Sequence, residues 1–469
     1  MTFDIAIINA RMVVPKVGIV DTNIAVKDGK IAEFTPDEVQ ADRRVDAEGL
    51  YVLPGAIDPH MHYGVYTPIE KAAESESRSA AVGGVTTMMR MFRLYGSYKQ
   101  KLRVHLDASK KSHIIDYSYH ASILMTEHLD EIAHCIESGI TSFKLYMNLN
   151  GELGTIYMDM EPYSNEMISG NVNIDDSLIR STIKTVAGYD GIVMVHAEDP
   201  DTCAREMVMG KSEGKTGLQA WSDCRPSKSE YESIAKISSW ARQDKCALYL
   251  PHIGSSQAID SIINERKNGT KIFVETCPHY LTHSTDFQNI RAKVVPPIRS
   301  KEDVQRMWQA LKEGTVNCIG TDHVANRLDM KMGNGDIWSA LSGFPGIATM
   351  LPVLLSEGVN KGRISIEKVA ELTSFNTAEI FGMFPKKGTI AIDSDADIVL
   401  IDLDKEQKVT PELLQSYSDY TIYDGMTIRG WPVLTMVRGS IVMEDGEVVG
   451  KPGYGEYVAR KPKPKSHGN

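Results

Sequence analysis

The sequence predicts an α/β protein: a (β/α)8 TIM-type barrel over residues 54–384, joined to a small β-sandwich domain made from residues 1–53 and 385–469. Two observations support this fold class. Between about residues 50 and 385, short β-branched runs alternate with longer amphipathic stretches, as expected for repeated strand–helix units. Both ends of the chain instead contain short apolar runs separated by turns, which is typical of antiparallel β structure.

Eight short apolar runs are expected to form the parallel strands of the barrel. Helical spacing fills most of the intervals between them, for example over residues 229–244 and 301–313. The third run has the least regular pattern because it is rich in tyrosine and serine. The eight runs are Tyr51–Ile57, Val85–Met91, Ile115–Ile123, Ile140–Tyr146, Gly191–Val195, Cys246–Pro251, Lys271–Glu275 and Val316–Gly320.

The two terminal segments are expected to share one domain. Each has apolar runs on both sides of an Asp-Gly pair, at residues 28–29 and 445–446, and this dipeptide is a hairpin signal. Neither end has enough strands to close a core alone, so we expect both to build one sandwich beside the barrel. The tail over residues 460–465 alternates proline with basic residues and is expected to be extended and solvated.

Composition excludes several classes of protein. The net charge of −11 argues against nucleic acid as a partner, because phosphate binding needs a basic face. No apolar run approaches the roughly 20 residues that span a bilayer, and the N-terminus lacks a signal-peptide pattern. The six cysteines are scattered and are expected to be reduced. We therefore expect a cytoplasmic enzyme that acts on a small molecule.

Side chains that bind metals fall where the predicted strands end. Because active sites of such barrels form at the C-terminal ends of the strands, five strands would deliver candidate ligands to one face. An isolated His-x-His pair or strand-end histidine is more often structural, and a strand-end aspartate is often a helix N-cap. The combination, in register with the barrel repeat, instead predicts a ligand cluster. Its members are His60, His62, Lys144, His196, His252 and Asp322.

The ligand types narrow the choice of metal. Imidazole and carboxylate together favour Zn²⁺, with Mn²⁺, Fe²⁺ or Co²⁺ as alternatives. Lys144 cannot bind a metal as an ammonium, which has no lone pair. Desolvation and neighbouring cations would favour its neutral amine, which can take up CO₂ to give an anionic carbamate that is able to bridge two ions.

These segments resemble the binuclear amidohydrolase superfamily, within its cyclic-amidase branch of hydantoinases, dihydropyrimidinases, allantoinases and dihydroorotases. The resemblance covers nearly the whole chain, and a C-terminal stretch that includes Arg429-Gly-Trp-Pro432 is particularly similar to hydantoinases. The segments that carry the metal motifs are Asp58-Pro-His-Met-His62, Phe143-Lys144-Leu145, Val195-His-Ala-Glu198, Pro251-His-Ile-Gly-Ser255 and Gly320-Thr-Asp-His323.

The resemblance implies two divalent ions per chain. His60, His62 and Asp322 would hold one ion, and His196 and His252 would hold the other. Carbamylated Lys144 and a hydroxide would bridge them, with the hydroxide as nucleophile. Asp322 would be the catalytic residue that carries a proton to the leaving nitrogen. Asp58 and His323 would lie behind the ligands and orient them. The resemblance also implies a homo-oligomer, with a tetramer as the expected form.

Two departures from the hydantoinase pattern leave the substrate open. A tyrosine that helps to bind the oxyanion usually stands five residues after the bridging lysine, but Leu149 occupies that position here. The segments Glu275-Thr-Cys-Pro-His-Tyr280 and Ser342-Gly-Phe-Pro-Gly346 are more similar to allantoinases and dihydroorotases. The expected substrate contacts are Leu149, Tyr146, Asn148, His279, Val295 and Ser342.

The favoured hypothesis is a hydrolase that opens a cyclic amide such as a hydantoin, dihydropyrimidine or imide. The alternative is a hydrolase of an acyclic amide, carbamate or urea, which the same metal centre could attack. A non-catalytic scaffold like the collapsin response mediators, which share this fold, is disfavoured. Those proteins typically lack parts of the metal set, whereas every ligand is present here.

Overall fold

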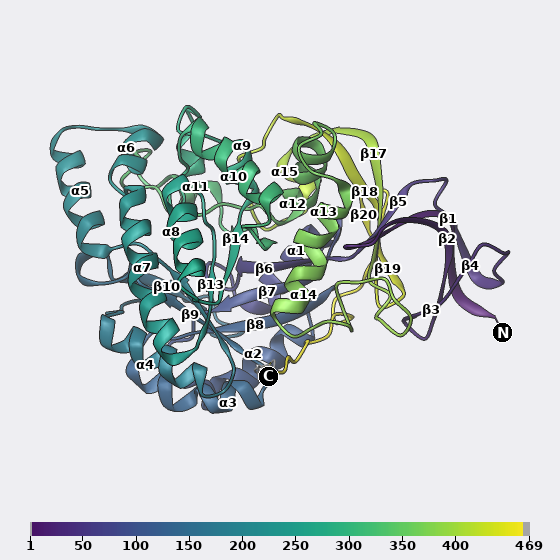
Figure 1. Ribbon diagram of the computed structural model, residues 1–469, viewed down its shortest axis with the longest axis horizontal. Coiled ribbons are helices and arrows are strands. Elements are labelled where there is room, and N and C mark those ends of the chain that lie inside the picture. The colour runs from purple at the N-terminus through teal and green to yellow at the C-terminus, as the bar shows by residue number, and fades with distance from the viewer. Residues whose placement is uncertain (1, 463–469) are drawn as a thin grey trace.

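The computed structural model describes residues 2–462 and contains the predicted barrel beside a β domain (Figure 1). The barrel sheet is parallel and curled, with the strand order β15-β14-β13-β12-β9-β8-β7-β6-β16. The predicted fold class is confirmed. The barrel strands are β6 (Ala56–His62), β7 (Val85–Phe92), β8 (Asp116–Ser122), β9 (Ser142–Tyr146), β12 (Ile192–His196), β13 (Ala247–Leu250), β14 (Ile272–Thr276), β15 (Cys318–Ile319) and β16 (His323–Val324).

The eighth predicted strand is interrupted at the point where the sheet closes. β15 pairs with β14, and β16 pairs with β6, so residues 318–324 connect the two edges of the sheet. The interruption contains Asp322, whose φ of 51° is uncommon for a residue with a side chain. The backbone therefore leaves strand geometry at the C-terminal end of the sheet, where barrels of this type build their active sites.

Helices pack around the outside of the barrel sheet (Figure 1). The two helices predicted most directly, over residues 229–244 and 301–313, correspond to α7 and α10. α10 begins with a capping box between Ser300 and Asp303 and buries Met307 and Leu311. No helix among residues 2–462 has the length and apolarity needed to cross a bilayer.

The helices of three or more turns are α1 (Ile69–Val82), α2 (Tyr98–Lys110), α4 (Asp176–Ala187), α5 (Pro200–Ser212), α7 (Ser227–Asp244), α8 (Ser256–Lys267) and α10 (Lys301–Glu313). The shorter α-helices are α3 (Ile132–Glu137), α6 (Gly217–Asp223), α9 (Pro278–Thr282), α11 (Leu328–Met332), α12 (Met350–Val353), α13 (Ile366–Ala370), α14 (Asn376–Ile380) and α15 (Pro411–Leu414). The short 3₁₀ and π segments are η1 (Thr126–Glu131), η2 (Gly151–Leu153), η3 (Ile290–Ala292), η4 (Ile347–Thr349), η5 (Leu354–Val359) and η6 (Glu371–Phe375).

Strands from both ends of the chain form the β domain, as one mixed sheet of nine strands. Residues 3–8 of β1 pair with β4, whereas residues 11–12 pair with β5, so β1 takes part in both halves of the sheet. The domain boundaries at residues 53/54 and 384/385 stay predictions. The strands are β1 (Phe3–Val14), β2 (Gly18–Lys27), β3 (Lys30–Thr35), β4 (Ala41–Asp46), β5 (Tyr51–Pro54), β17 (Ile398–Lys408), β18 (Thr427–Val437), β19 (Ser440–Glu444) and β20 (Glu447–Val448).

The first predicted strand, Tyr51–Ile57, is in fact two strands that belong to different sheets. β5 pairs with β1 and β17 in the β domain, whereas β6 pairs with β7 in the barrel. Gly55 separates them, and its N–H donates to the Asp397 carbonyl. A Cβ on Gly55 would lie 2.1 Å from the Thr86 hydroxyl, so only glycine fits where the chain passes between the sheets.

The expectation of a solvated basic tail is wrong for its first residue. Arg460 is fully buried against β8 and β9, where its guanidinium donates to the Ser118 and Ser142 hydroxyls and to the Tyr119 carbonyl. Hydrogen bonds from Val458 N–H to Tyr117 and from Arg460 N–H to Gly139 guide the chain along the barrel. Residues 463–465 of the predicted tail lie outside the described residues.

A buried ionic network connects the β domain to the barrel. Lys387 Nζ lies 2.6 Å from Asp116, 2.7 Å from Asp397 and 3.0 Å from Asp395. Arg438 also reaches Asp116, at 3.1 Å. Asp116 belongs to barrel strand β8, whereas Asp397 and Arg438 flank strands of the β domain. These three carboxylates could in principle hold a metal, but Lys387 already supplies the positive charge.

Replacement of Lys387 by methionine is expected to destabilise the protein by about 3–5 kcal/mol, because three buried carboxylates lose their shared cation. Urea unfolding followed by tryptophan fluorescence would measure the change. Lys386→Met is the matched control, since Lys386 is exposed and lies 3.8 Å from Asp395. Equal stability of the two variants would contradict a structural role for the network.

Candidate metal centre and active site

A cavity of about 230 Å³ opens at the C-terminal ends of the barrel strands. All six predicted metal ligands line it, together with five of the six predicted substrate contacts. The sixth, His279, does not line this cavity; it is buried beside Phe344, with 5.0 Å between the ring centroids. The lining residues are His60, His62, Arg93, Lys144, Tyr146, Asn148, Leu149, Thr155, Ile156, His196, His252, Val294, Val295, Asp322, Val324, Ser342 and Gly343.

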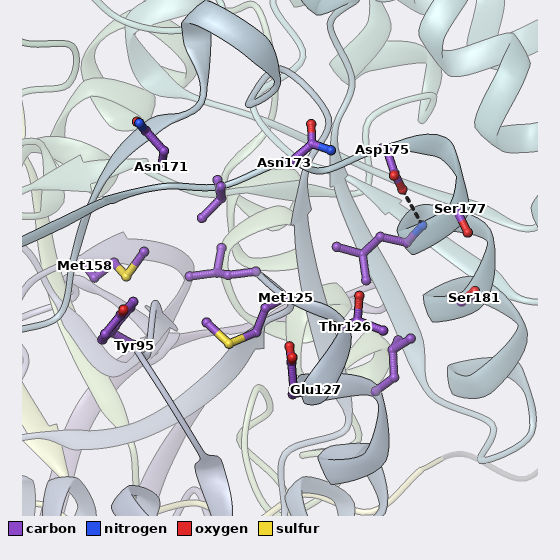
Figure 2. Close-up of a pocket in the computed structure, with 14 residues that line it drawn as sticks. Tyr95, Met125, Thr126, Glu127, Met158, Asn171, Asn173, Asp175, Ser177 and Ser181 are labelled. Atoms are coloured by element: carbon purple, nitrogen blue, oxygen red, sulfur yellow. Dashed lines mark hydrogen bonds between the residues drawn. The ribbon is translucent and has the colours of Figure 1, made fainter.

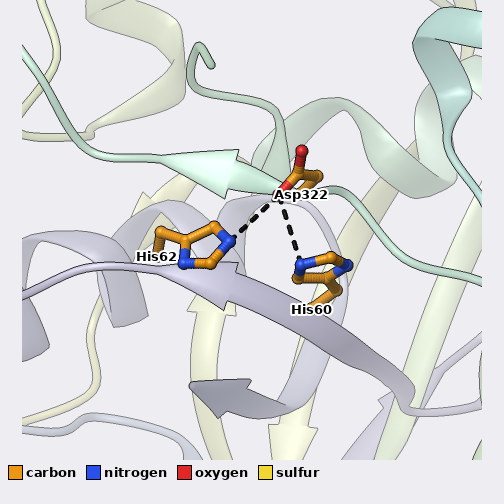
Figure 3. A group of neighbouring side chains, drawn as sticks. All are labelled: His60, His62 and Asp322. Carbon is orange, nitrogen blue, oxygen red and sulfur yellow. Dashed lines mark ion pairs between the residues drawn. The ribbon is translucent and has the colours of Figure 1, made fainter. Parts of the chain in front are cut away.

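Three of the predicted ligands meet at one point (Figure 3). Asp322 Oδ1 lies 3.3 Å from His60 Nε2 and 3.1 Å from His62 Nε2. His60 and His62 are two residues apart on β6, so their side chains point to the same side of the strand. Two imidazole nitrogens and one carboxylate oxygen close together make a donor set that suits a divalent transition metal.

Glu275, at the end of β14, fixes the orientation of His60. Its Oε1 accepts from His60 Nδ1 at 2.8 Å and from the His252 N–H at 3.1 Å, and its Oε2 accepts from the Tyr249 hydroxyl. Because Nδ1 carries the proton, the lone pair of His60 Nε2 faces Asp322. Burial raises the pKa of Glu275 to about 7. Glu275 was not predicted as a site residue, although a glutamate in a buried strand is a signal for a functional role.

A second carboxylate orients His196. Glu198 Oε2 lies 2.5 Å from His196 Nε2, and Arg225 holds Glu198 through two hydrogen bonds of 3.1 and 2.8 Å. Since Nε2 is occupied, His196 Nδ1 is the nitrogen left for a metal. His252 lies beside His196, with 4.6 Å between the ring centroids, and His60 is 5.3 Å from His252. The predicted second ligand pair is thus adjacent to the first group.

Burial keeps these histidines neutral. It lowers the pKa of His60 to about 3 and that of His196 to about 4, and it holds the pKa values of His62 and His252 well below their usual range. Neutral imidazole is the form that binds metals. The pH dependence of metal binding is therefore not set by ordinary histidine titration near pH 6.5.

Lys144 lies on β9 within the same buried group. Desolvation lowers the pKa of its amine from 10.5 to about 7, so a large share of the neutral form exists near neutral pH. Within residues 2–462, buried atoms without a hydrogen-bond partner include Lys144 Nζ, His60 Nε2, His62 Nδ1 and His252 Nδ1. Unpaired polar atoms are rare in protein interiors, so this concentration around one cavity fits a site built for a further ligand.

Asp58 and His323 act on the backbone rather than on the ligand side chains. Asp58 Oδ1 accepts from the N–H groups of His60 and Thr321, both at 3.1 Å. It therefore positions the main chain beside two predicted ligands. His323 differs from the expectation: its Nε2 lies 2.9 Å from Glu76, and its Nδ1 accepts from the N–H groups of Gly346 and Ile347. Those contacts hold the 346–347 turn.

The outer wall of the cavity is largely apolar and rests on loops. Val294 and Val295 come from one loop, and Ser342 and Gly343 come from another. Lys331 joins the two loops, because its buried Nζ donates to the carbonyls of Lys293, Leu341 and Gly343 at 2.6–2.8 Å. Leu149 faces the same cavity and offers no hydrogen-bond donor from its side chain.

Arg93 is a cavity residue that the sequence analysis did not single out. It follows β7, and its Nη2 lies 3.3 Å from His62 Nε2. Its Nε donates to the Tyr146 hydroxyl at 3.0 Å, so Tyr146 is positioned by Arg93 rather than free in the cavity. An arginine within an apolar run carries no periodic signal, which is why the sequence pattern did not indicate it.

A larger cavity of about 430 Å³ is lined in part by the hairpin of β10 (Thr155–Met158) and β11 (Ile168–Asn171) (Figure 2). Its two acidic lining residues are Glu127 and Asp175, and Asp175 caps α4 by accepting from the Leu178 N–H. The residues that line it include no histidine, cysteine or lysine. Of these two cavities, only the smaller one is lined by histidines.

The geometry agrees with comparisons to known proteins. The model of the amidohydrolase family matches residues 51–442, which include every predicted ligand. The chain belongs to the amidohydrolase family. It is 31% identical to the L-hydantoinase of Paenarthrobacter aurescens, over 98% of each chain. It is 32% identical to the D-hydantoinase of Geobacillus stearothermophilus, over 96% of this chain and 95% of that one.

Solved structures of hydantoinases also resemble this chain over nearly its whole length. The L-hydantoinase (dihydropyrimidinase) from Arthrobacter aurescens superposes with a TM-score of 0.89 at 31% identity, covering 98% of this chain and 100% of that one. A D-hydantoinase structure also gives 0.89, at 30% identity. These relatives place the chain in the cyclic-amidase branch of the amidohydrolase family. Membership of this family implies a binuclear metal site, and the clustered histidines and Asp322 are candidate ligands.

For this amidohydrolase, Glu275→Gln is expected to weaken metal binding by about 10–100-fold, because a neutral amide is a weaker acceptor for the His60 Nδ1 proton than a carboxylate and makes His60 a less basic ligand. Competition with a chelator of known affinity would measure the loss. Glu265→Gln is the control, since Glu265 is also buried but pairs with Arg242 on the barrel exterior. Unchanged affinity in Glu275→Gln would rule out the orienting role.

Proposed function

We propose that this chain is a metal-dependent hydrolase that opens a cyclic amide with water. The observation that carries the proposal is the meeting of four neutral histidines, Lys144 and Asp322 in one buried cavity. The names of the relatives support it, since L-hydantoinases and D-hydantoinases both match over nearly the whole chain.

The residues fit two divalent ions. His60, His62 and Asp322 would hold one, and His196 and His252 would hold the other. Lys144, as a carbamate, would bridge them, and Zn²⁺ is the ion that this donor set favours. When bound, such a pair supplies an activated water and a polarised substrate carbonyl.

Asp322 is proposed as the proton carrier of the reaction. In ring opening a C–O bond forms from water to the amide carbon, the C–N bond breaks, and a proton from water passes to the departing nitrogen. Burial raises the pKa of Asp322, so its carboxylate accepts a proton more readily than an exposed one. Its position next to both His60 and His62 supports this role.

The substrate wall differs from the hydantoinase pattern at Leu149. A tyrosine there would donate a hydrogen bond to the developing oxyanion, which leucine cannot do. The nearby hydroxyl of Tyr146 already accepts from Arg93 and lies 3.4 Å from the Ser122 hydroxyl. We therefore propose that simple hydantoin and dihydrouracil are poorer substrates than the ring for which this cavity is built.

A ring-opening screen tests the function. The panel would contain hydantoins, dihydrouracils, allantoin, dihydroorotate, imides and lactams, with acyclic amides, carbamates and ureas as the alternative class. Loss of activity on chelation and recovery with Zn²⁺ would support the proposal. Turnover of acyclic compounds alone would favour the alternative, and light scattering on the same sample would test the proposed homotetramer.

Lys144→Ala is expected to lose at least one metal ion per chain, because the bridging carbamate cannot form. Elemental analysis would measure the ions, and intact mass would show whether the wild type carries one added CO₂. Since the amine pKa is about 7, reconstitution of the metal-free wild type with bicarbonate should be faster above pH 7 than below it. Two ions and full activity in Lys144→Ala without an added carboxylic acid would contradict the bridge.

Asp322→Asn is expected to keep much of its metal but to lose about 10²–10⁴-fold in kcat, because an amide offers an oxygen but cannot carry a proton. Steady-state kinetics with metal analysis of the same preparation would separate the two effects. Asp107→Asn, on the exposed face of α2, is the control. A loss of less than tenfold would count against the assignment.

A further inference from the structure

The positive charge of Arg93 distinguishes this cavity. The guanidinium makes three contacts, with the Tyr146 hydroxyl at 3.0 Å, the Tyr157 carbonyl at 3.4 Å and His62 Nε2 at 3.3 Å. All three partners are neutral. Within the described part of the chain, no carboxylate lies within ion-pair distance of this guanidinium.

Neighbouring buried arginines are paired with carboxylates. Arg90, three residues earlier on β7, lies 2.8 Å from Asp159, and Arg225 binds Glu198 with two hydrogen bonds. Asp159 could have paired with Arg93 as well, but its second oxygen accepts from the Arg93 backbone N–H at 2.6 Å. Arg93 thus has no carboxylate in direct contact and is compensated only by the more distant charges of Asp159 and Asp322, so a ligand with negative charge would add a direct ion pair.

One of the three contacts cannot persist in the loaded enzyme. His62 Nε2 has a single lone pair, and under the proposed function this lone pair belongs to a metal ion. Arg93 Nη2 then loses its acceptor while it still lines the cavity. Asp322 is the single carboxylate that lines this cavity, and it too is assigned to the metal.

We propose that Arg93 selects a cyclic amide that carries a carboxylate substituent. The planar guanidinium matches a carboxylate with two parallel hydrogen bonds. The remaining wall is neutral, formed largely by Leu149, Ile156, Val294 and Val295, so it binds a ring through apolar contact. A cavity of about 230 Å³ admits a small ring with a short acidic arm. This inference rests on the proposed function, because it concerns the substrate of the same site.

Matched pairs of substrates test the proposal. Hydantoin and dihydrouracil rings would each carry either a carboxymethyl group or its neutral isostere, a carboxamidomethyl group. The wild type is expected to prefer the carboxylate by about ten- to hundredfold in kcat/KM, as is typical of a charge-assisted hydrogen bond. Arg93→Gln should lower kcat/KM on the carboxymethyl rings more than on the neutral rings, so that the ratio within each pair falls to about one, and Arg93→Lys should keep part of that ratio. Arg103→Gln, an exposed charge on α2, is the control.

Each outcome decides the proposal. Equal loss on both members of a pair in Arg93→Gln, or no preference in the wild type, would overturn it and leave Arg93 as a support for Tyr146. An effect confined to inhibition by the ring-opened product would also overturn it, because the arginine would then bind the newly formed carboxylate. Elemental analysis of each variant would show that the metal content is unchanged.

Calorimetry separates this proposal from the proposed function. If the wild type opens none of the four rings, the choice of these rings as substrates fails. Binding of the carboxymethyl and carboxamidomethyl rings to the metal-loaded protein is then still measurable. Tighter binding of the carboxylate that disappears in Arg93→Gln would uphold the role of Arg93. Equal binding, or no binding of either ring, would overturn it.

Discussion

The closure of the barrel and the geometry of the candidate metal centre depend on the same hydrogen bonds. Asp58 accepts from His60 on the first barrel strand and from Thr321 in the segment that completes the sheet. A buried carboxylate with few donors would be destabilising, and burial raises the pKa of Asp58 to about 7. The Asp58 carboxylate therefore has all of its hydrogen-bond donors only when both edges of the sheet are in place. The ligands on each edge consequently become aligned only when the barrel is complete.

Carboxylates behind the ligands repeat this principle. Glu275 connects His60 with the main chain of His252, which belongs to the other predicted ion. Glu198 connects His196 with Arg225, outside the strands. His60 and His196 thus each have one ring nitrogen bonded to a scaffold carboxylate and one left for the cavity. The buried carboxylates of Glu275 and Glu198 therefore serve to orient the imidazoles.

Much of the fold and of the ligand set could be predicted because both depend on local patterns. Strand runs are apolar and evenly spaced, and His60, His62, His196 and His252 stand at strand ends, where a polar residue interrupts the run. The split of the first run at Gly55 could not be predicted, since the residues on its two sides, Tyr51–Pro54 and Ala56-Ile57, are mostly apolar alike and join different sheets. A one-dimensional pattern does not specify which sheet a strand joins.

Local sequence patterns also do not indicate residues whose partners lie far away in the sequence. Glu275, Arg93 and Arg460 each lie in or near a strand and contact groups far away in sequence. The same holds for His323, whose neighbour in sequence is a predicted ligand but whose contacts are Glu76 and the 346–347 turn. The position of His323 beside Asp322 indicated a role near the metal, but its side chain points toward Glu76 instead.

Lys331, which joins the two loops of the cavity wall, holds the shape of the wall without taking part in the metal centre. The three hydrogen bonds of Lys331 go to main-chain oxygens of the two loops, so these bonds hold the path of the loops whichever side chains line the cavity. Replacements at Val294, Val295 or Ser342 would alter the lining without releasing the loops or touching the histidines. Substitutions at these positions would therefore change which ring the cavity accepts while the groups proposed to hold the metal stay in place.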